Sequence, residues 1–161
     1  MSIPAQPRPG KAQLTQVDRV TFPGLIPEEI IVFKAWLALH AAEYTSYAYN
    51  VRVGRGFDPG PAFDDNARRN AIANSQRRID ALLYRGAQPY IIEVKRRANI
   101  QVMGQLIAYV DLWHRDNTLQ PQPVPILVCS TIDNDLAYVM QKRGLAFNVV
   151  AADFSTIDAL R

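Results

Sequence analysis

The chain of 161 residues has the length of one domain, and its 48% hydrophobic and 20% charged residues are ordinary for a globular protein. The single cysteine, Cys129, excludes an internal disulfide and any zinc or iron–sulfur site built from several cysteines. No apolar run reaches the roughly 18 residues of a membrane span, and the N-terminus lacks the apolar core of a secretory signal. These features predict a soluble, cytoplasmic domain without a membrane partner.

Basic charge is concentrated in one part of the chain. The net charge is +3, and 14 of the 18 basic residues are arginine. Residues 52–97 hold nine of these arginines and Lys95 against five carboxylates, a local net charge of +5. Guanidinium groups suit bidentate contact with phosphate, so this segment is expected to bind a polyanion such as nucleic acid. A solvated surface that keeps the protein soluble is the alternative.

The N-terminal segment is rich in proline. Five prolines among residues 1–27 predict an extended arm rather than a packed element. We place the arm at residues 1–26 and one folded domain at residues 27–161. Because free arms of this kind are usually disordered, we expect this arm to lie against a second copy of the chain or a larger protein assembly.

A helix and a strand are predicted next. Pro27 and the two glutamates after it suit the first turn of a helix, and apolar residues at helical spacing extend it over residues 27–44. The aromatic and β-branched run 44–53 predicts a strand. Glycines and prolines at 54–61 predict a loop, which leads into a polar stretch at 64–74 with no predicted element.

The second half of the chain continues the mixture of helices and strands. Two strand-like runs, 76–84 and 89–95, are joined by residues 85–88 and predict a hairpin. The remaining predicted elements are a helix capped by Asn99 and running to about Arg115, a buried strand at 124–131, a helix at 133–143 and a strand at 145–150. This order predicts a mixed α/β fold.

Two carboxylates of the predicted hairpin are expected to lie close together. With Gly86 and Ala87 as the turn residues, Asp80 lies directly opposite Glu93, with Cβ atoms about 4.5–5.5 Å apart. Carboxylates this close repel each other and require a proton, a basic neighbour or a metal cation. Lys95 is two residues from Glu93, so both side chains leave the same face of the strand.

These three groups suit metal-assisted hydrolysis of a phosphodiester. A hard divalent cation takes oxygen ligands, here two carboxylates completed by water. Lys95 is placed to orient or help deprotonate a water at the metal and to stabilise charge on a phosphate. An ordinary cluster of acidic and basic residues on a hairpin surface is the alternative.

The motifs resemble those of the PD-(D/E)XK nuclease superfamily. Asp80 ends the first motif strand, and Glu93-Val94-Lys95 supplies the E-x-K. On the following helix, Gln105-Leu-Ile-Ala-Tyr109 resembles the Q-x-x-x-Y motif of the RecB and lambda-exonuclease branch. The resemblance covers residues 27–150 in element order, and its motifs lie within residues 78–109. It implies a restriction-endonuclease-like αβββαβ core, with a central mixed sheet flanked by helices.

The resemblance also implies roles for individual residues. Asp80 and Glu93 would be Mg²⁺ ligands, with the backbone carbonyl of Val94 as a third ligand and Mn²⁺ able to substitute. Lys95 would be the catalytic lysine.

Supporting residues are implied as well. Gln105 and Tyr109 would support the site or contact the DNA backbone. Members of the superfamily often add an acidic residue from the first helix, for which Glu43 is the first candidate and Glu29 the second. Ile79 stands where the motif has proline, a common departure.

Eight arginines are expected to follow the phosphate backbone of DNA: Arg52, Arg55, Arg68, Arg69, Arg77, Arg78, Arg96 and Arg97.

Three interpretations remain open from the sequence. The first is a metal-dependent DNA nuclease in a bacterial or phage-infected cell. Its length leaves little room for a sequence-reading subdomain, so selectivity would come from DNA shape, ends, branches or a partner. The second is a non-enzymatic component of a phage particle on the same fold, of head–tail connector or head-completion type, which the arm favours. The third, a plain arginine-rich nucleic-acid-binding domain, leaves the carboxylate pair unexplained.

Overall fold

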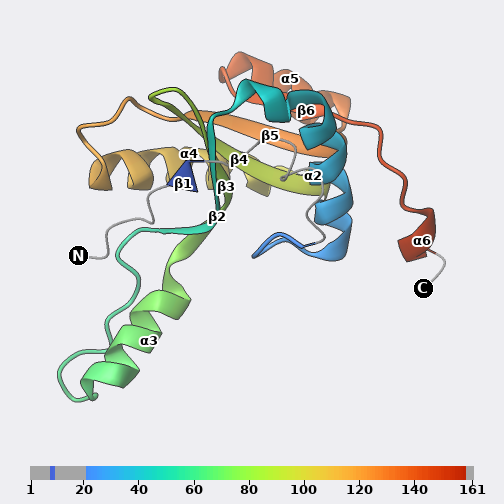
Figure 1. Cartoon of the computed structure of the whole chain (residues 1–161). Helices are drawn as coiled ribbons and strands as arrows, with labels where there is room; N and C mark the ends of the chain where they lie inside the picture. The colour runs from blue at the N-terminus through green and yellow to red at the C-terminus, as the bar shows by residue number, and fades with distance from the viewer. Residues whose placement is uncertain (1–7, 10–20, 159–161) are drawn as a thin grey trace.

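The computed structural model describes residues 8–9 and 21–158 (Figure 1). Its elements are β1 (Arg8–Pro9), α2 (Pro27–His40), a 3-10 turn (Ala41–Glu43), β2 (Ser46–Val53), α3 (Asp65–Ser75), β3 (Arg77–Arg85), β4 (Gln88–Arg97), α4 (Gln101–Asp116), β5 (Val124–Thr131), α5 (Asn134–Lys142), β6 (Ala146–Val149) and α6 (Ser155–Asp158). The predicted αβββαβ core is confirmed as α2, β2, β3, β4, α4 and β5.

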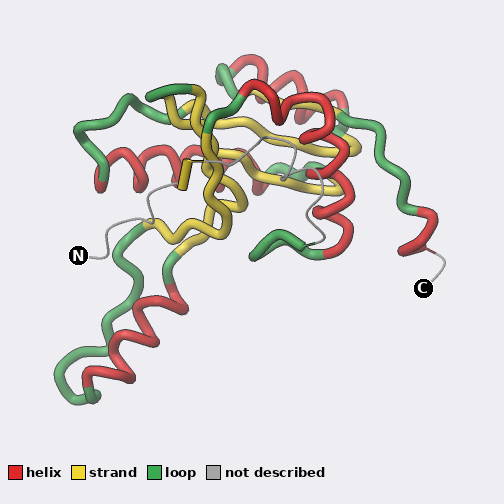
Figure 2. Tube along the Cα trace, viewed as in Figure 1, coloured by secondary structure: helices red, strands yellow, loops and turns green. Residues whose placement is uncertain are grey.

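The strands, drawn in yellow in Figure 2, form one mixed sheet. Their order is β1-β2-β3-β4-β5-β6. The pairs from β1 to β4 are antiparallel, whereas β4, β5 and β6 are parallel. The centre of β5 is buried at Leu127, Val128 and Cys129. Its unbroken apolar sequence therefore reflects a parallel strand that is covered on both faces.

Helices cover the two faces of the sheet. On one face, Leu106 and Trp113 of α4 pack with Met140 of α5. On the other face, Phe33 and Trp36 of α2 lie in a second hydrophobic cluster. The three-layer arrangement follows from the apolar side of each helix, which must be buried against the sheet.

The hairpin register predicted from the sequence is confirmed from the pair Arg85–Gln88 to the pair Ala81–Ile92. Gly86 has a φ of +59°, the left-handed conformation that suits the first turn residue of a type II′ hairpin. Beyond Ala81 and Ile92 the two strands no longer pair, although β3 starts at Arg77 and β4 runs to Arg97. We call the space between residues 77–80 and 93–97 the strand fork.

An irregularity in β2 explains where the strand fork opens. Asn50 has a φ of +53°, and neither Asn50 nor Asp80, which faces it in the register, is part of the β2–β3 ladder. Tyr49 and Val51 are two residues apart but pack on opposite faces of the sheet. The in-and-out alternation of side chains along β2 is therefore offset by one residue at Asn50. Beyond this point β2 stays paired with β3, whereas β4 stays paired with β5.

The polar stretch between β2 and β3 is a helix that was not predicted from the sequence. The Asp64 carboxylate accepts the N–H groups of Asn66 and Ala67, each at 2.9 Å, and so caps α3. None of the residues of α3 is buried, and the helix leads away from the sheet (Figure 1). Without an apolar stripe, the helix lacks the periodicity by which helices are predicted.

Most of the predicted arm lies outside the described residues, so its contact with an assembly stays a prediction. Residues 8–9 pair with Ser46 and Tyr47 of β2. Phe22 and Leu25 are buried, and the Phe22 and Phe33 rings meet edge to face at 5.1 Å. The packed body therefore begins before Pro27. Across residues 8–9 and 21–158, no helix is long and apolar enough to cross a membrane.

The packing of α4 predicts opposite results for two neighbouring residues. Leu106→Ala removes a fully buried side chain and is expected to lower the free energy of unfolding by about 2–5 kcal/mol. Ile107→Ala, at a position 48% exposed, serves as the control and should change it by less than about 0.5 kcal/mol. Urea unfolding of both variants measures the difference, and similar losses would contradict the orientation of α4.

Candidate active site in the strand fork

Asp80 is fixed at the point where the two strands part. Its Oδ2 accepts the backbone N–H of Val94 at 2.8 Å. The side chain thus takes the place of the next ladder bond between β3 and β4. Because this bond joins the two strands, the Asp80 carboxylate is held beside residues 93–95 of β4.

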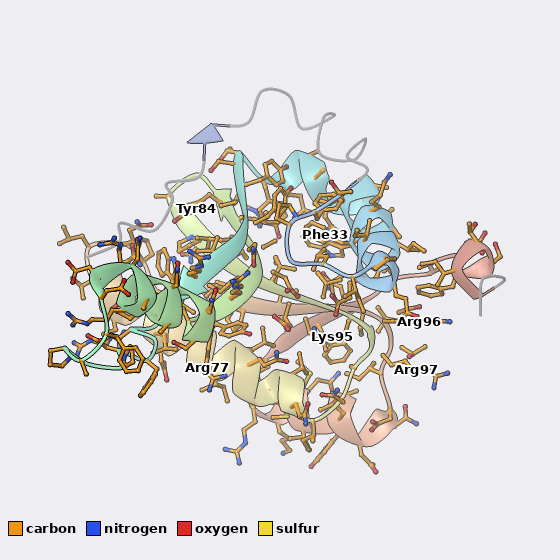
Figure 3. The ribbon with its side chains drawn as sticks, turned by 90° about the horizontal axis from the view of Figure 1, so that it is seen from below. Phe33, Arg77, Tyr84, Lys95, Arg96 and Arg97 are labelled. Atoms are coloured by element: carbon orange, nitrogen blue, oxygen red, sulfur yellow. The ribbon has the colours of Figure 1, made fainter. Side chains whose placement is uncertain are left out.

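Lys95 lies between two carboxylates. Its Nζ is 3.0 Å from Oε1 of Glu93 and 3.0 Å from Oε1 of Glu29. Glu93 belongs to β4, whereas Glu29 belongs to the first turn of α2, where its Oε2 accepts the Ile26 N–H at 3.3 Å. Figure 3 shows Lys95 between α2 and α4. The start of α2 is therefore tied to the strand fork through the lysine.

One oxygen of the site has no partner. Glu93 is 1% exposed, and its Oε2 is buried without a hydrogen bond in the described part of the chain. A buried polar atom left in this way costs about 1–3 kcal/mol. The charges of Asp80, Lys95 and Glu29 all act on Glu93. A cation bound from outside the chain would supply the partner that its Oε2 lacks among the described residues.

The surroundings shift the pKa values of all three motif residues. Burial raises the pKa of Asp80, opposed by the Val94 N–H and the Lys95 charge. Burial and the Asp80 charge raise the pKa of Glu93, opposed by Lys95. Burial lowers the pKa of Lys95, but Glu93 and Asp80 outweigh this effect and raise it. Lys95 therefore stays an ammonium ion. Asp80 and Glu93 stay protonated up to a higher pH than ordinary carboxyl groups do.

The motif residues of α4 lie beside this cluster. Tyr109 is buried, and burial raises its pKa, with the Glu93 charge adding to the effect. A side-chain hydrogen bond with Gln105 opposes the shift. Gln105 and Tyr109 are therefore neighbours of each other, and Tyr109 feels the charge of the carboxylates.

The acidic residue contributed by α2 is Glu29 rather than Glu43. Glu43 forms ion pairs with His40 and Arg85 at the hairpin end of the sheet. That end lies five residues along β3 from Asp80. The first candidate from the sequence is therefore wrong in position, because the first turn of α2, not its end, lies over the strand fork.

The predicted DNA-binding arginines fall into two groups. Arg52, Arg55, Arg77, Arg78 and Arg97 are exposed and form no ion pair with the described residues. Figure 3 shows Arg77 and Arg97 on opposite sides of Lys95 in that view.

The other three predicted arginines contact neighbouring side chains, and Arg69 among them is exposed. Arg96 is 3.3 Å from Glu28, and its guanidinium lies 4.1 Å from the centre of the Phe154 ring. Arg68 binds Asp58 through two nitrogens, and Arg69 donates to Asn66. Arg96 and Arg68 are therefore poor candidates for contact with phosphate.

The donor set fits a divalent cation in part. Within residues 8–9 and 21–158, no three His, Cys, Asp or Glu side chains are arranged to hold a metal ion by themselves. Asp80 and Glu93 supply two carboxylates, and the Glu93 Oε2 lacks any other partner. Such a pair suits a hard cation that keeps several water ligands, as Mg²⁺ usually does.

Comparison with known proteins identifies one family. The family model described as the endonuclease NucS C-terminal domain matches residues 72–158, more than half of the chain. None of the curated proteins matches the chain in sequence.

Two solved structures align with part of the chain. A repair endonuclease from Pyrococcus abyssi has a TM-score of 0.41 and 22% identity over 47% of this chain and 34% of that protein. An EndoMS–dsDNA complex has a TM-score of 0.41 and 22% identity over 63% of this chain and 39% of that protein. The chain thus spans less than half the length of either protein.

The buried carboxyl pair predicts a pH-dependent stability. A carboxyl group whose pKa is higher in the folded than in the unfolded protein contributes its full stability when the pH is below its unfolded-state pKa. This contribution is lost as the pH rises through the folded-state pKa. In EDTA, Glu93→Gln should therefore be more stable than the wild type, by a margin that grows by about 1–3 kcal/mol from pH 5 to pH 8. Urea unfolding at both pH values measures the margin.

Asp135→Asn provides the control, because Asp135 is an exposed acid in the first turn of α5 and forms no ion pair with a histidine among the described residues. Its margin over the wild type should stay constant with pH. A constant margin for Glu93→Gln would show that Glu93 is ionised in the folded protein at an ordinary pKa.

Proposed function

We propose that this chain, which belongs to the endonuclease NucS C-terminal domain family, hydrolyses phosphodiester bonds in DNA at the strand fork. The single observation that carries the proposal is the cluster of Asp80, Glu93 and Lys95, in which no donor group of the described residues bonds to the buried Glu93 Oε2. Stability alone would favour an apolar residue at such a position. A carboxylate at such a position is best explained by chemistry that needs it.

Asp80 and Glu93 would hold a Mg²⁺ or Mn²⁺ ion, with the backbone carbonyl of Val94 as the third ligand that the PD-(D/E)XK resemblance implies. When bound, such an ion supplies a Lewis acid for the phosphate and lowers the pKa of water. The bond from the Val94 N–H keeps the Asp80 carboxylate turned toward β4. Burial of Glu93 excludes bulk water and strengthens every electrostatic interaction in the site.

Lys95 would act on the charge of the phosphate. It is 24% exposed in its side chain, so its ammonium borders solvent while its partners are buried. Its raised pKa keeps it charged at neutral pH, and it therefore stabilises a developing negative charge on the phosphate oxygens. Glu29 holds the ammonium from the side of α2 and is a positioning residue in this proposal.

The arginines support DNA as the substrate. Arg77 and Arg78 lie on the β3 side of the strand fork, and Arg97 lies on the β4 side. Cations on both sides of the carboxylates allow a phosphate backbone to cross the fork despite the acidic centre. Gln105 and Tyr109 contact each other, and Tyr109 lies near the charge of Glu93. We therefore include in the proposal the supporting role that the resemblance to the RecB and lambda-exonuclease branch implies for them. The phage-component alternative depends on the arm and stays a prediction.

Cleavage of a supercoiled plasmid tests the proposed function. With Mg²⁺ or Mn²⁺ the wild type should cut, and Asp80→Asn, Glu93→Gln and Lys95→Ala should each lower the rate by roughly 100- to 1,000-fold. Glu43→Gln, the control, should cut as the wild type does. Cleavage that persists in all three site variants, or that needs no divalent cation, would overturn the proposal.

Glu29→Gln separates positioning from chemistry. The amide keeps the size of the side chain but loses the charge that holds Lys95, so kcat should fall by roughly 10- to 100-fold while KM changes little. Its neighbour Glu28 contacts Arg96 instead, and Glu28→Gln should leave kcat near the wild-type value. Equal effects of the two substitutions would indicate a general effect on the start of α2.

A further inference from the structure

The outward face of α3 carries amide and guanidinium groups. Asn66, Arg69, Asn70 and Asn74 are exposed and recur three or four residues apart, so they share one side of the helix. Arg69 donates from Nη2 to Oδ1 of Asn66 at 2.8 Å. The half-buried residues of α3 are Ala67, Arg68, Ala71, Ile72 and Ala73.

Local contacts with the preceding loop hold α3 in place. Arg68 donates to both carboxylate oxygens of Asp58, at 2.9 and 2.6 Å. Ser75 Oγ accepts the N–H of Phe57 at 2.6 Å. At Gly56, with a φ of +68°, a Cβ would lie only 2.3 Å from the Ile72 carbonyl oxygen. An isolated helix of 11 residues is marginal in water, so this packing determines where α3 points.

Four arginines surround the base of the extension formed by residues 54–76. Arg52 and Arg78 are direct cross-strand partners, Arg77 is opposite Val53, and Arg55 follows in the loop. Like charges directly opposite each other destabilise a strand pair. These arginines form no ion pair within the described residues, so the pair is best stabilised by an anion from outside.

We propose that α3 enters the major groove of duplex DNA and reads base edges there, while the arginines at its base hold the phosphate backbone. This inference rests on the proposed nuclease function and deepens it. The major groove, about 12 Å wide, admits an α-helix. Asparagine pairs with the edge of adenine and arginine with that of guanine, and both side chains are on the outward face.

The extension joins the active site directly. Arg78 precedes Asp80 by two residues on β3, a separation of about 6.7 Å along a strand. A phosphate held by Arg78 is thus close to the one in the strand fork. The family match begins at residue 72, so residues 54–71 lie outside the matched segment. The extension would be a small sequence-reading element in a chain whose length leaves little room for a separate subdomain.

Two aromatic side chains favour a different partner. Phe57 and Phe63 are 66% and 54% exposed in the loop before α3. Exposed phenylalanines are typical of a protein–protein interface, for example one with a second copy of this chain. The net charge of the arginines at the base favours DNA, and the experiment distinguishes the two.

Binding of the full chain to DNA in EDTA tests the inference. The probe is a pool of fluorescein-labelled 30-bp duplexes with a randomised centre, from which bound duplexes are selected and sequenced. The wild type should enrich a short motif, and Asn70→Ala/Asn74→Ala should lose that enrichment and bind the enriched duplex at least about 5-fold more weakly. Alanine is the better helix former, so this variant keeps α3.

The salt dependence separates base contacts from phosphate contacts. The slope of log K against log[salt] should be unchanged in Asn70→Ala/Asn74→Ala, because amides release no counterions. It should fall by about 2 in Arg77→Ala/Arg78→Ala. Gln141→Ala, an exposed amide on α5, is the matched control and should bind as the wild type does.

Each contrary outcome is distinct. If the wild type enriches no motif, or the asparagine variant binds like the wild type while plasmid is still cut, the inference fails and the proposed function stands. If the wild type neither binds nor cuts DNA, both fail. A dimer in sedimentation that Phe57→Ser/Phe63→Ser abolishes, with DNA binding unchanged, would assign the extension to a second copy and overturn the inference.

Discussion

The parting of β3 from β4 beyond Ala81 and Ile92 sets the position of every group in the site. If the ladder continued, Val94 would pair with a backbone carbonyl and Asp80 would be one more strand residue. Instead the Asp80 carboxylate accepts the Val94 N–H, and the two strands diverge around it. The same divergence sends β2 and β3 out together toward α3, so the candidate active site and the extension have one structural origin.

The strand fork also brings carboxylates together in an unfavourable, buried environment. Glu93 is buried beside Asp80, and burial raises the pKa of both carboxyl groups. Lys95 offsets part of this repulsion by contacting Glu93 and Glu29, and it thereby ties the start of α2 to β4. A site of this kind reduces the stability of the protein, which is common where binding or catalysis requires the charge. Membership of the NucS C-terminal domain family is consistent with that explanation.

The sequence predicted the hairpin and its carboxylates because both depend on local rules. Gly86 determines the turn, and the turn determines the register as far as the pair Ala81–Ile92, one residue short of Asp80 and Glu93. The contribution of Glu29 was ranked second, because the position of the first turn of α2 depends on packing between elements far apart in the chain. The helix α3 was missed because it buries none of its residues and so carries no apolar period. The ion pair of Arg96 with Glu28 was not predicted, because the two residues are 68 positions apart in sequence.

Calorimetric titration of Mn²⁺ into the metal-free protein tests the central claim most directly, because it needs neither DNA nor turnover. If Asp80 and the unpartnered oxygen of Glu93 form a cation site, the wild type and Glu43→Gln should bind Mn²⁺ with the same affinity. Asp80→Asn and Glu93→Gln should show no saturable heat. Undiminished Mn²⁺ binding in both site variants would contradict the assignment of the strand fork as the active centre.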